Sequence, residues 1–520
     1  MDFIDNLSTE YWENFTVNNE DLEFLYNHLL EIEIPQTTSK LLYAIINNRI
    51  NNIKSDLLKH RSSQGEIYKP ESTYNINDKI VFPKFDWKIG KVIGKRPGIN
   101  PDIDDFDVIE VEFDDYTKKY FASRHSNHLL NDAQDINNND PNLKIEKVLN
   151  NFNNILLSQV SISLEKNQDL VQIAGKWFPK SLLIDINVGY LNLAEAVLDM
   201  ETGGPLTTQY ILEQIDLPTD TNAKLSEFSM NFALQEDERF DEVGPAGKTL
   251  WFLKRLEPNK VLDTPLHLKN ICNYQYDYEN IAQYIEILDN QIYDELDLMK
   301  YDDEIDQISL SLIYPHWRNG TLPLSNRINT FFPTAYEAPR VQFTLIDSED
   351  NSKYSGWVVR SSKYVYGLEE WYKDKELIPG SLINIQRGQS PGEVLIKVIK
   401  RRSTREWIRT ALVGTDGEIV FATLKQMVSA DFNERMVIAV PDIDAIDNLW
   451  NSYKNVNLEN IIQKFLRELV KLNPQGHVHA LEIYSAVNLV KRCPPGPILD
   501  ILFSSPWSKH FGDLYFHLNS

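Results

Sequence analysis

Apolar residues recur every three or four positions along the first part of the chain. The series consists of Leu22, Phe24, Leu25, His28, Leu29, Leu41, Leu42, Ile45 and Ile46. This spacing is that of one face of an α-helix, and no alternation typical of a strand interrupts it. We therefore expect residues 1–68 to form a helical N-terminal domain in which this face packs.

The pattern changes over residues 69–131. The segment YNINDKIVFPKFDWKIGKVIGKRPG has short β-prone runs that contain Gly90 and Gly94, and DFDVIEVEFDDYTKKYF alternates apolar and acidic residues. Strands around a G-x-V-x-G core resemble small SH3-like β-barrels, a fold that recurs with unrelated functions. The predicted rim is acidic, which disfavours phosphate binding and favours a peptide-binding or purely structural barrel. Its carboxylates are Asp102, Asp104, Asp105, Asp107, Asp114 and Asp115.

Residues 132–186 are expected to connect this barrel to the next domain. DAQDINNNDPNLK is rich in Asn and Asp and predicts a linker. A helix over 145–158 and strand-like pieces such as LVQIAGKWF are expected to follow.

Residues 187–258 show the order helix, turn, helix, helix, hairpin. A Gly-Gly-Pro turn separates the first two helices, and Thr207 or Thr208 is expected to cap the second. RFDEVGPAGKTLWFLKRL predicts a hairpin whose tip lies at 244–247. This is the winged-helix order, and the hairpin phrase resembles the HARE-type winged helix of the delta subunit of bacterial RNA polymerase. The resemblance implies a winged-helix fold and makes RNA polymerase a candidate partner.

The C-terminal segment repeats this unit. HVHALEIYSAVNLVKRCPPGPILDILFSSPWSKHFGDLYFHLN again gives helix, turn, helix and hairpin, and its end parallels ERFDEVGPAGKTLWFL. Internal similarity of this kind predicts a second winged helix at 456–520.

The region between the repeats is expected to hold an acidic helical connector at 259–306 and a β-rich domain at 307–403. The β-rich domain has the order strand, short helix, strand, turn, strand ending in Trp357, helix at 367–376, and two closing strands. That order resembles the B3-type DNA-binding pseudobarrel, with Ser381 where the family usually has Asp. Residues 404–455 are expected to add further strands and a loop, VPDIDAID. The fold class predicted for the whole chain is thus α+β and multi-domain.

Charge is distributed unevenly along the chain. The net charge is −24, which opposes binding of nucleic acid by the chain as a whole. Between residues 307 and 410, however, fifteen Lys and Arg stand against ten Asp and Glu. Cations interleaved with aromatic rings suit a nucleic-acid surface, because cations take phosphates and flat rings take bases. The alternative, a solvated strand end with ordinary salt bridges to the acidic remainder, stays open.

The predicted nucleic-acid contacts are Arg318, Arg327, Arg360, Lys363, Arg387, Lys397, Lys400, Arg401, Arg402, Arg405, Trp407 and Arg409, with Lys491 and Arg492 in the second winged helix. In the first winged helix the third helix offers Lys224 but also several acids, so a protein-docking role is favoured there. The second module, which also has Lys509 and His510, is the better DNA contact of the two.

No motif for catalysis or for a cofactor is found. The pairs His125/His128 and His477/His479 have no cysteine partners, and no H-E-x-x-H, P-loop or nucleophile elbow occurs. The acidic clusters at 302–306 and 442–447 are expected to be solvated loops and caps. We therefore expect a protein that is not an enzyme and needs no cofactor or metal.

The chain has no apolar run long enough to cross a membrane, and MDFIDNLSTEYWENF does not have the pattern of a signal peptide. A cytoplasmic location without a membrane partner is expected. The whole chain is similar to long bacterial proteins with this module order, a resemblance that implies no activity. The leading hypothesis is a non-enzymatic DNA-binding or RNA-polymerase-associated regulator. The alternatives are a protein-interaction scaffold with docking winged helices, and a nuclease or defence effector whose pseudobarrel recognises DNA.

Overall fold

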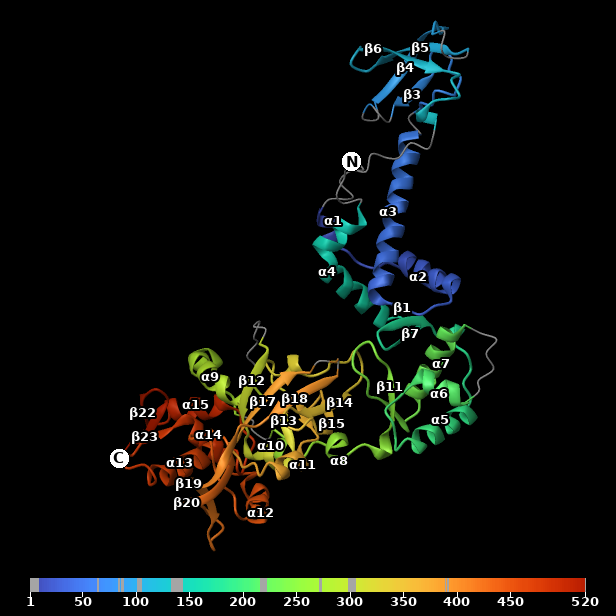
Figure 1. The fold of residues 1–520 in the computed structure, drawn as a ribbon. Coiled ribbons are helices and arrows are strands. Elements are labelled where there is room, and N and C mark those ends of the chain that lie inside the picture. The colour runs from blue at the N-terminus through green and yellow to red at the C-terminus, as the bar shows by residue number, and fades with distance from the viewer. Residues whose placement is uncertain are drawn as a thin grey trace. The chain divides into compact units, whose positions relative to one another are not determined.

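The computed structural model describes residues 9–62, 65–82, 85, 88–100, 105–131, 144–215, 222–270, 274–297, 305–388, 390 and 392–519. Over these residues the chain is an α+β protein with fifteen α-helices, several small sheets and one curled seven-stranded half-barrel (Figure 1). It divides into two compact units, one of residues 1–184 and 221–228, the other of residues 185–220 and 229–520. No helix among the described residues is long and apolar enough to span a bilayer.

The first unit begins with the predicted helices. They are α1 (Thr9–Glu13), α2 (Asn19–Ile32) and α3 (Thr38–Ser62), to which α4 (Ile145–Glu165) adds a fourth. α2 starts at a capping box, in which the side chain of Asn18 and that of Asp21 each accept the other's backbone N–H. The apolar face found in the sequence is buried at Leu25, Leu29 and Leu41. The prediction of a helical start is confirmed.

Two small sheets complete the first unit. One has the order β1-β8-β7 and the other the order β2-β3-β4-β5-β6. Their strands are β1 (Gln36–Thr37), β7 (Leu170–Ile173) and β8 (Lys176–Pro179), and β2 (Glu66–Ile67), β3 (Lys79–Phe82), β4 (Lys88–Pro97), β5 (Asp107–Phe113) and β6 (Lys118–Ser123). A Cβ at Gly90 would lie 2.3 Å from the Val111 side chain, which explains the glycine in β4. Asp102, Asp104 and residues 132–143 of the linker predicted over 132–144 lie outside the described residues.

The second unit opens with most of the module predicted at 187–258, of which residues 221–228 are assigned to the first unit. Its elements are α5 (Val188–Met200), β9 (Leu206–Thr207), α6 (Thr208–Ile215), α7 (Ala223–Glu236), β10 (Phe240–Glu242) and β11 (Leu250–Leu253). Thr207 is the capping residue of α6, since its hydroxyl accepts the N–H of Tyr210 at 3.2 Å. β11 lies between β10 and β9. The predicted element order is confirmed.

The half-barrel follows after α8 (Asn259–Leu262) and α9 (Tyr278–Ile292). Its elements are β12 (Gln307–Ser311), α10 (Tyr314–Asn319), β13 (Thr321–Pro323), β14 (Arg340–Asp347), β15 (Lys353–Val359), β16 (Tyr364–Tyr366), α11 (Glu369–Asp374), β17 (Leu382–Arg387) and β18 (Glu393–Lys397). The strand order is β12-β17-β18-β14-β15-β16-β13, and β14 with β18 is its parallel pair. Trp357 lies buried on β15, and α11 occupies the predicted helix position.

A long hairpin leaves the half-barrel. It consists of β19 (Lys400–Val413) and β20 (Ile419–Ala430). The prediction that VPDIDAID is a loop is wrong in its second half, where α12 (Ile443–Tyr453) begins. Asp442 caps this helix by accepting the N–H of Ala445 at 2.9 Å, and Ile446, Leu449 and Trp450 are buried at helical spacing. Asp442 therefore marks the start of a helix, whose apolar residues follow at i, i+3 and i+4 spacing.

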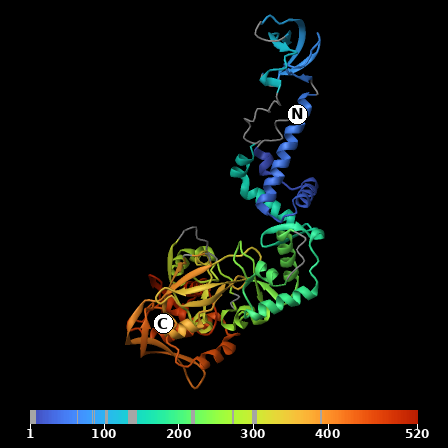
Figure 2. The ribbon, with the colours of Figure 1, turned by 45° about the vertical axis from the view of Figure 1, so that its right-hand side comes forward.

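The C-terminal module consists of α13 (Leu458–Val470), β21 (Val478–His479), α14 (Ala480–Val487), α15 (Pro495–Ser504), β22 (Ser508–Gly512) and β23 (Tyr515–Leu518). Its sheet order, β21-β23-β22, corresponds strand for strand to β9-β11-β10 of the first module. Figure 2 shows the hairpin beside these C-terminal helices, and Ala411, Ile419 and Phe421 share one apolar core with them.

Candidate nucleic-acid interface

One face of the hairpin passes from buried to exposed as the strands leave the turn. Near the turn, Ala411 and Phe421 face each other across the strands and are buried against the C-terminal helices. The next pairs on the same face are Arg409 with Thr423, Trp407 with Lys425, and Arg405 with Met427, because side chains alternate along a strand. Trp407 therefore lies where the hairpin passes beyond the packed module.

Trp407 is the centre of this exposed end. It is 65% exposed, and Nζ of Lys425 lies 5.1 Å from its ring centroid. Met427 beside it is 56% exposed. A large ring held in solvent under a cation suits a contact with a partner, since a cation over a tryptophan face is favourable even at exposed sites.

Arg409 and Arg435 connect the hairpin to the C-terminal module. Arg409 forms an ion pair with Glu482 at the start of α14, and its Nη1 donates to the carbonyl of Arg435 at 3.0 Å. Burial lowers the pKa of Arg409, although the charge of Glu482 acts against this shift. Arg435 is exposed, its guanidinium lies 5.5 Å from the Tyr515 ring centroid, and Nη2 donates to the Tyr515 hydroxyl at 3.2 Å.

The contacts continue to the turn of β22 and β23. His477 packs edge-on against Tyr515 at 5.1 Å and parallel to Phe511 at 5.8 Å. Phe511 is 69% exposed. Across the two strands Lys509 stands opposite His517, whose ring lies 6.3 Å from that of Phe511.

These residues form one connected surface, which we call the cationic–aromatic strip. It consists of Arg405, Trp407, Arg409, Lys425, Arg435, His477, Lys509, Phe511, Tyr515 and His517. Beneath it, burial and then the charge of Arg435 lower the pKa of His479 to about 4, so this histidine is neutral at physiological pH. Its Nδ1 accepts the N–H of Leu481 at 3.1 Å and so fixes the start of α14.

The strip is positively charged in an acidic protein. Within the described part of the chain Arg405, Lys425, Arg435 and Lys509 have no ion pair, whereas Glu482 neutralises Arg409. Two exposed carboxylates lie close to strip residues in the sequence: Glu434 precedes Arg435, and Asp513 lies between Phe511 and Tyr515. Cations therefore outnumber carboxylates along the strip.

Several of the other predicted contacts are engaged within the fold. Arg318 binds Asp447 at 2.8 Å, Lys400 binds Glu349 at 2.8 Å and Arg401 binds Asp431 at 2.5 Å. These are partly exposed pairs of the kind that the ordinary salt-bridge alternative predicts.

A second group of predicted cations contacts rings or carbonyls or is exposed elsewhere. Arg360 donates to the carbonyl of Ala338 at 2.9 Å. The guanidinium of Arg327 lies 5.9 Å from the ring centroid of Tyr293, and that of Arg387 lies 5.9 Å from the ring centroid of Phe331. Over the described residues, the exposed side chains that have no ion pair and lie outside the strip include Lys363, Lys397 and Arg402.

Lys491 and Arg492 require a correction, because neither side chain is free to reach a phosphate. The ammonium of Lys491 donates to the carbonyls of Lys454 and Val456 at 3.2 and 2.9 Å. Arg492 is fully buried and binds Asp294 at 2.5 Å and Glu295 at 2.9 Å. We remove both residues from the predicted surface.

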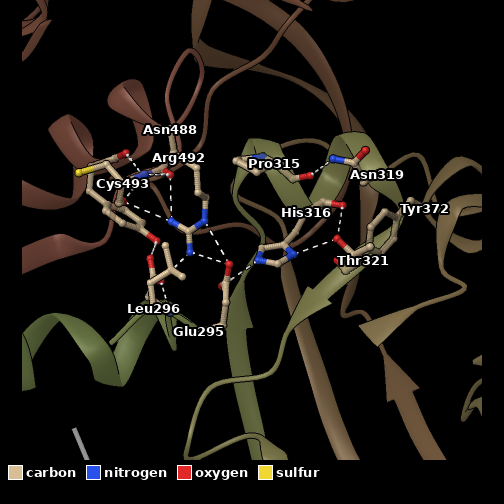
Figure 3. A network of polar contacts seen from close by, with 12 residues as sticks. Glu295, Leu296, Pro315, His316, Asn319, Thr321, Tyr372, Asn488, Arg492 and Cys493 are labelled. Carbon is tan, nitrogen blue, oxygen red and sulfur yellow. Dashed lines mark hydrogen bonds and ion pairs between the residues drawn. The ribbon is translucent and has the colours of Figure 1, made fainter. Parts of the chain in front are cut away.

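Figure 3 shows that Arg492 belongs to a buried network. The guanidinium of Arg492 points at the carboxylate of Glu295, and Oε2 of Glu295 lies 3.1 Å from Nε2 of His316. Nη1 of Arg492 also donates to Oδ1 of Asn488 at 3.1 Å. Burial acts to raise the pKa of Glu295, but Arg492 and His316 outweigh it and hold that pKa below its usual value. The network joins the C-terminal module to the segment after α9 and to α10. Its role is to hold the fold together.

Neither third helix of the two modules offers a basic face for a DNA groove. Residues 495–499 at the start of α15 are all buried. In α7, Ser229, Met230 and Asn231 are buried, and its exposed positions include Lys224, Gln235 and Glu236. A groove-reading helix needs exposed donors along one side.

Sequence reasoning named Arg405, Trp407 and Arg409 as contacts and Lys509 as a cation of the second module, and it did not name the other strip residues as contacts. Lys425 could have been found by pairing the two strands of the hairpin in register. Arg435 and Tyr515 come together only through the packing of the C-terminal module.

Among the described residues no group of three or more His, Cys, Asp or Glu side chains is arranged to hold a metal ion. Cys493 is buried, and Cys272 lies outside the described residues. No protein-family model, curated protein or solved structure matches the chain.

Proposed function

We propose that this protein is a non-enzymatic nucleic-acid-binding regulator, of the kind that acts in transcription or other DNA transactions, and that the cationic–aromatic strip is its contact surface. The observation that supports this most is the strip itself. It combines unpaired cations with the exposed rings of Trp407 and Phe511 in a chain of net charge −24. Cations and rings in this combination bind phosphates and bases together.

The module structure supports the same proposal. The two repeated modules share one element order and one sheet order with each other, and that element order is the one for which winged helices were predicted. The half-barrel has the element order for which a B3-type pseudobarrel was predicted. The five-stranded sheet at 66–123 is assigned as the SH3-like module. In this proposal the first module contacts protein, for which RNA polymerase is the candidate.

Titration of fluorescein-labelled oligonucleotides with the full chain, followed by fluorescence anisotropy, tests the contact surface. The variant reverses the three strip cations Arg405, Lys425 and Arg435 to Glu. We expect its affinity at low salt to fall at least about 100-fold. The slope of log K against log salt should become less negative by roughly 2 to 3, because each of the three lost phosphate contacts contributes about 0.7–0.9 to its magnitude.

The matched control reverses three exposed lysines outside the strip and outside the predicted contacts, Lys166, Lys176 and Lys269, so the net charge changes equally. Its affinity should stay within about threefold of the parent, since distant charges are screened beyond ~10 Å. Equal losses in both variants, or no binding by the parent at low salt, would contradict the proposal.

The protein partner is tested by a pull-down from bacterial lysate with and without nuclease. RNA polymerase that stays bound after nuclease treatment supports a direct contact. Polymerase that is lost with the nucleic acid indicates a shared template, and a lysate without polymerase in either arm removes this partner from the proposal.

A further inference from the structure

We infer that the cationic–aromatic strip binds single-stranded nucleic acid, with unpaired bases stacked on Trp407 and Phe511. This inference rests on the proposed function and specifies its ligand. It depends on three features: the positions of the exposed rings, the helices and turns around the strip, and the positions of the cations.

The two most exposed rings of the strip lie at separate places on it. Trp407 is on β19, and Phe511 is at the end of β22 beside the turn to β23. Lys425 lies over the ring of Trp407, and the rings of His477 and His517 contact that of Phe511. In duplex DNA the faces of the bases are covered by their neighbours, so exposed rings gain stacking contacts only from unpaired bases.

The elements around the strip do not suit entry into a duplex groove. The start of α15 is buried, as described above. A β-ribbon can also enter a major groove, but both ribbons here carry acids at their turns. The turn of the long hairpin has the exposed Asp416, and the turn between β22 and β23 has the exposed Asp513. These carboxylates would meet the phosphates that line a groove.

The cations lie along the path between the two rings. Trp407 and Arg409 share one face of β19. From Arg409, contacts pass through Arg435 to Tyr515, and then through His477 to Phe511. A single strand can follow such a path because its backbone is flexible and its bases can turn toward separate rings. Phosphates would lie near Arg435 and Lys425, while the rings take bases.

The experiment compares three labelled probes of equal length: oligo-dT, oligo-rU and a mixed-sequence DNA duplex. Trp407→Ala and Phe511→Ala are each expected to weaken binding of a single strand about 5- to 100-fold, the range that stacking of one base contributes. The salt slope should not change, because no phosphate contact is removed. The comparison of oligo-dT with oligo-rU separates DNA from RNA as the ligand.

Two further variants control for effects on folding. Trp407→Phe keeps a flat ring and should retain affinity within about threefold. Tyr336→Ala removes an exposed ring outside the strip, 61% exposed, and should bind like the parent.

The outcomes separate this inference from the proposed function. If the duplex binds as tightly as the single strands and Trp407→Ala changes nothing, while the triple charge reversal still weakens binding, the inference is overturned and the proposed function stands. If no probe binds at low salt, both fail. Loss of single-strand binding in Trp407→Ala and Phe511→Ala, with duplex affinity unchanged, supports the inference.

Discussion

The first and the C-terminal modules of the second unit have the same order of helices and strands, yet they use their hairpins differently. In the first module the hairpin is packed against the half-barrel. Phe252 meets Trp357 edge-on at 5.2 Å, and the N–H of Ala246 donates to the carbonyl of Thr334 at 2.6 Å. In the C-terminal module the equivalent hairpin buries Leu514 and Phe516, but Phe511 at its turn is 69% exposed.

The strand register shows which residues make this difference. Asp241 pairs with Phe252 in the first hairpin, and Lys509 pairs with His517 in the second. With β11 and β23 aligned through their pairing to β9 and β21, Asp241 and Lys509 occupy the same position. Asp241 binds Arg340 of the half-barrel, whereas Lys509 has no ion pair within the described residues. One repeated hairpin thus forms an internal contact and the other a free cationic surface.

The two modules also differ in how buried charge attaches them to the rest of the unit. The C-terminal module uses Arg492 against Asp294 and Glu295, with His316 as a further partner. The first module uses one cation, Arg340, for Asp241 and Glu257. Burial and then Asp241 raise the pKa of Glu257 to about 8, so this cluster has a carboxylate in excess.

The largest effect is expected from Arg492→Met. This change leaves Asp294 and Glu295 buried without their cation, and breaking a buried pair in this way costs roughly 3–5 kcal/mol. Urea unfolding measures the loss of free energy of unfolding. Arg402→Met, at an exposed position, is the control and should change stability by less than about 0.5 kcal/mol. A loss below about 1 kcal/mol for Arg492→Met would show that the network does not hold the C-terminal module in place.

The second prediction concerns the free energy of unfolding as a function of pH. The contribution of Glu257 decreases as pH rises, whereas that of Glu295 decreases as pH falls. The pKa of Glu257 is raised in the fold, so the folded protein holds a proton that the unfolded chain releases above pH ~4.5. Stability from this group is present at low pH and is lost as pH rises from about 4.5 to about 8, at roughly 1.4 kcal/mol for each unit of pH. Glu295, whose pKa is lowered, contributes stability that is lost as pH falls through its folded pKa.

Glu257→Gln tests this difference, because glutamine keeps the shape of the protonated acid. We expect the variant to match the parent near pH 5 and to be more stable near pH 8, measured by urea unfolding at both values. Glu434→Gln, at an exposed carboxylate, should follow the parent at both. Parallel pH profiles for Glu257→Gln and the parent would contradict the charge excess in the first module.

The sequence was sufficient for features that are local. Helical spacing predicted α2 and α3, and the repeated phrase at 508–518 predicted the second hairpin. Exposed cations next to Trp407 were recognised because they are adjacent in the chain. The burial of Arg492 was not recognised, since its carboxylates, Asp294 and Glu295, are far away in sequence and resemble any other acidic stretch. Most of the strip could not be predicted from the sequence for the same reason. Arg435, Tyr515 and His477 come close to Arg409 only when the C-terminal module packs on the hairpin.

The smallest effect is expected from giving the C-terminal hairpin the charge of the first. Lys509→Asp places at that position the residue that the first module has there, Asp241. Because one phosphate contact is lost and a like charge is added, affinity for a single-stranded oligonucleotide should fall about fivefold, and the salt slope should lose about 0.7. Anisotropy titrations over a range of salt concentrations measure both, with Lys269→Asp as the control of equal charge. An unchanged slope would place Lys509 outside the contact, and the binding surface would then end before β22. If the salt dependence of binding becomes weaker in Lys509→Asp but not in Lys269→Asp, the residue at this one position of the repeated hairpin determines whether the hairpin binds nucleic acid or packs within the protein.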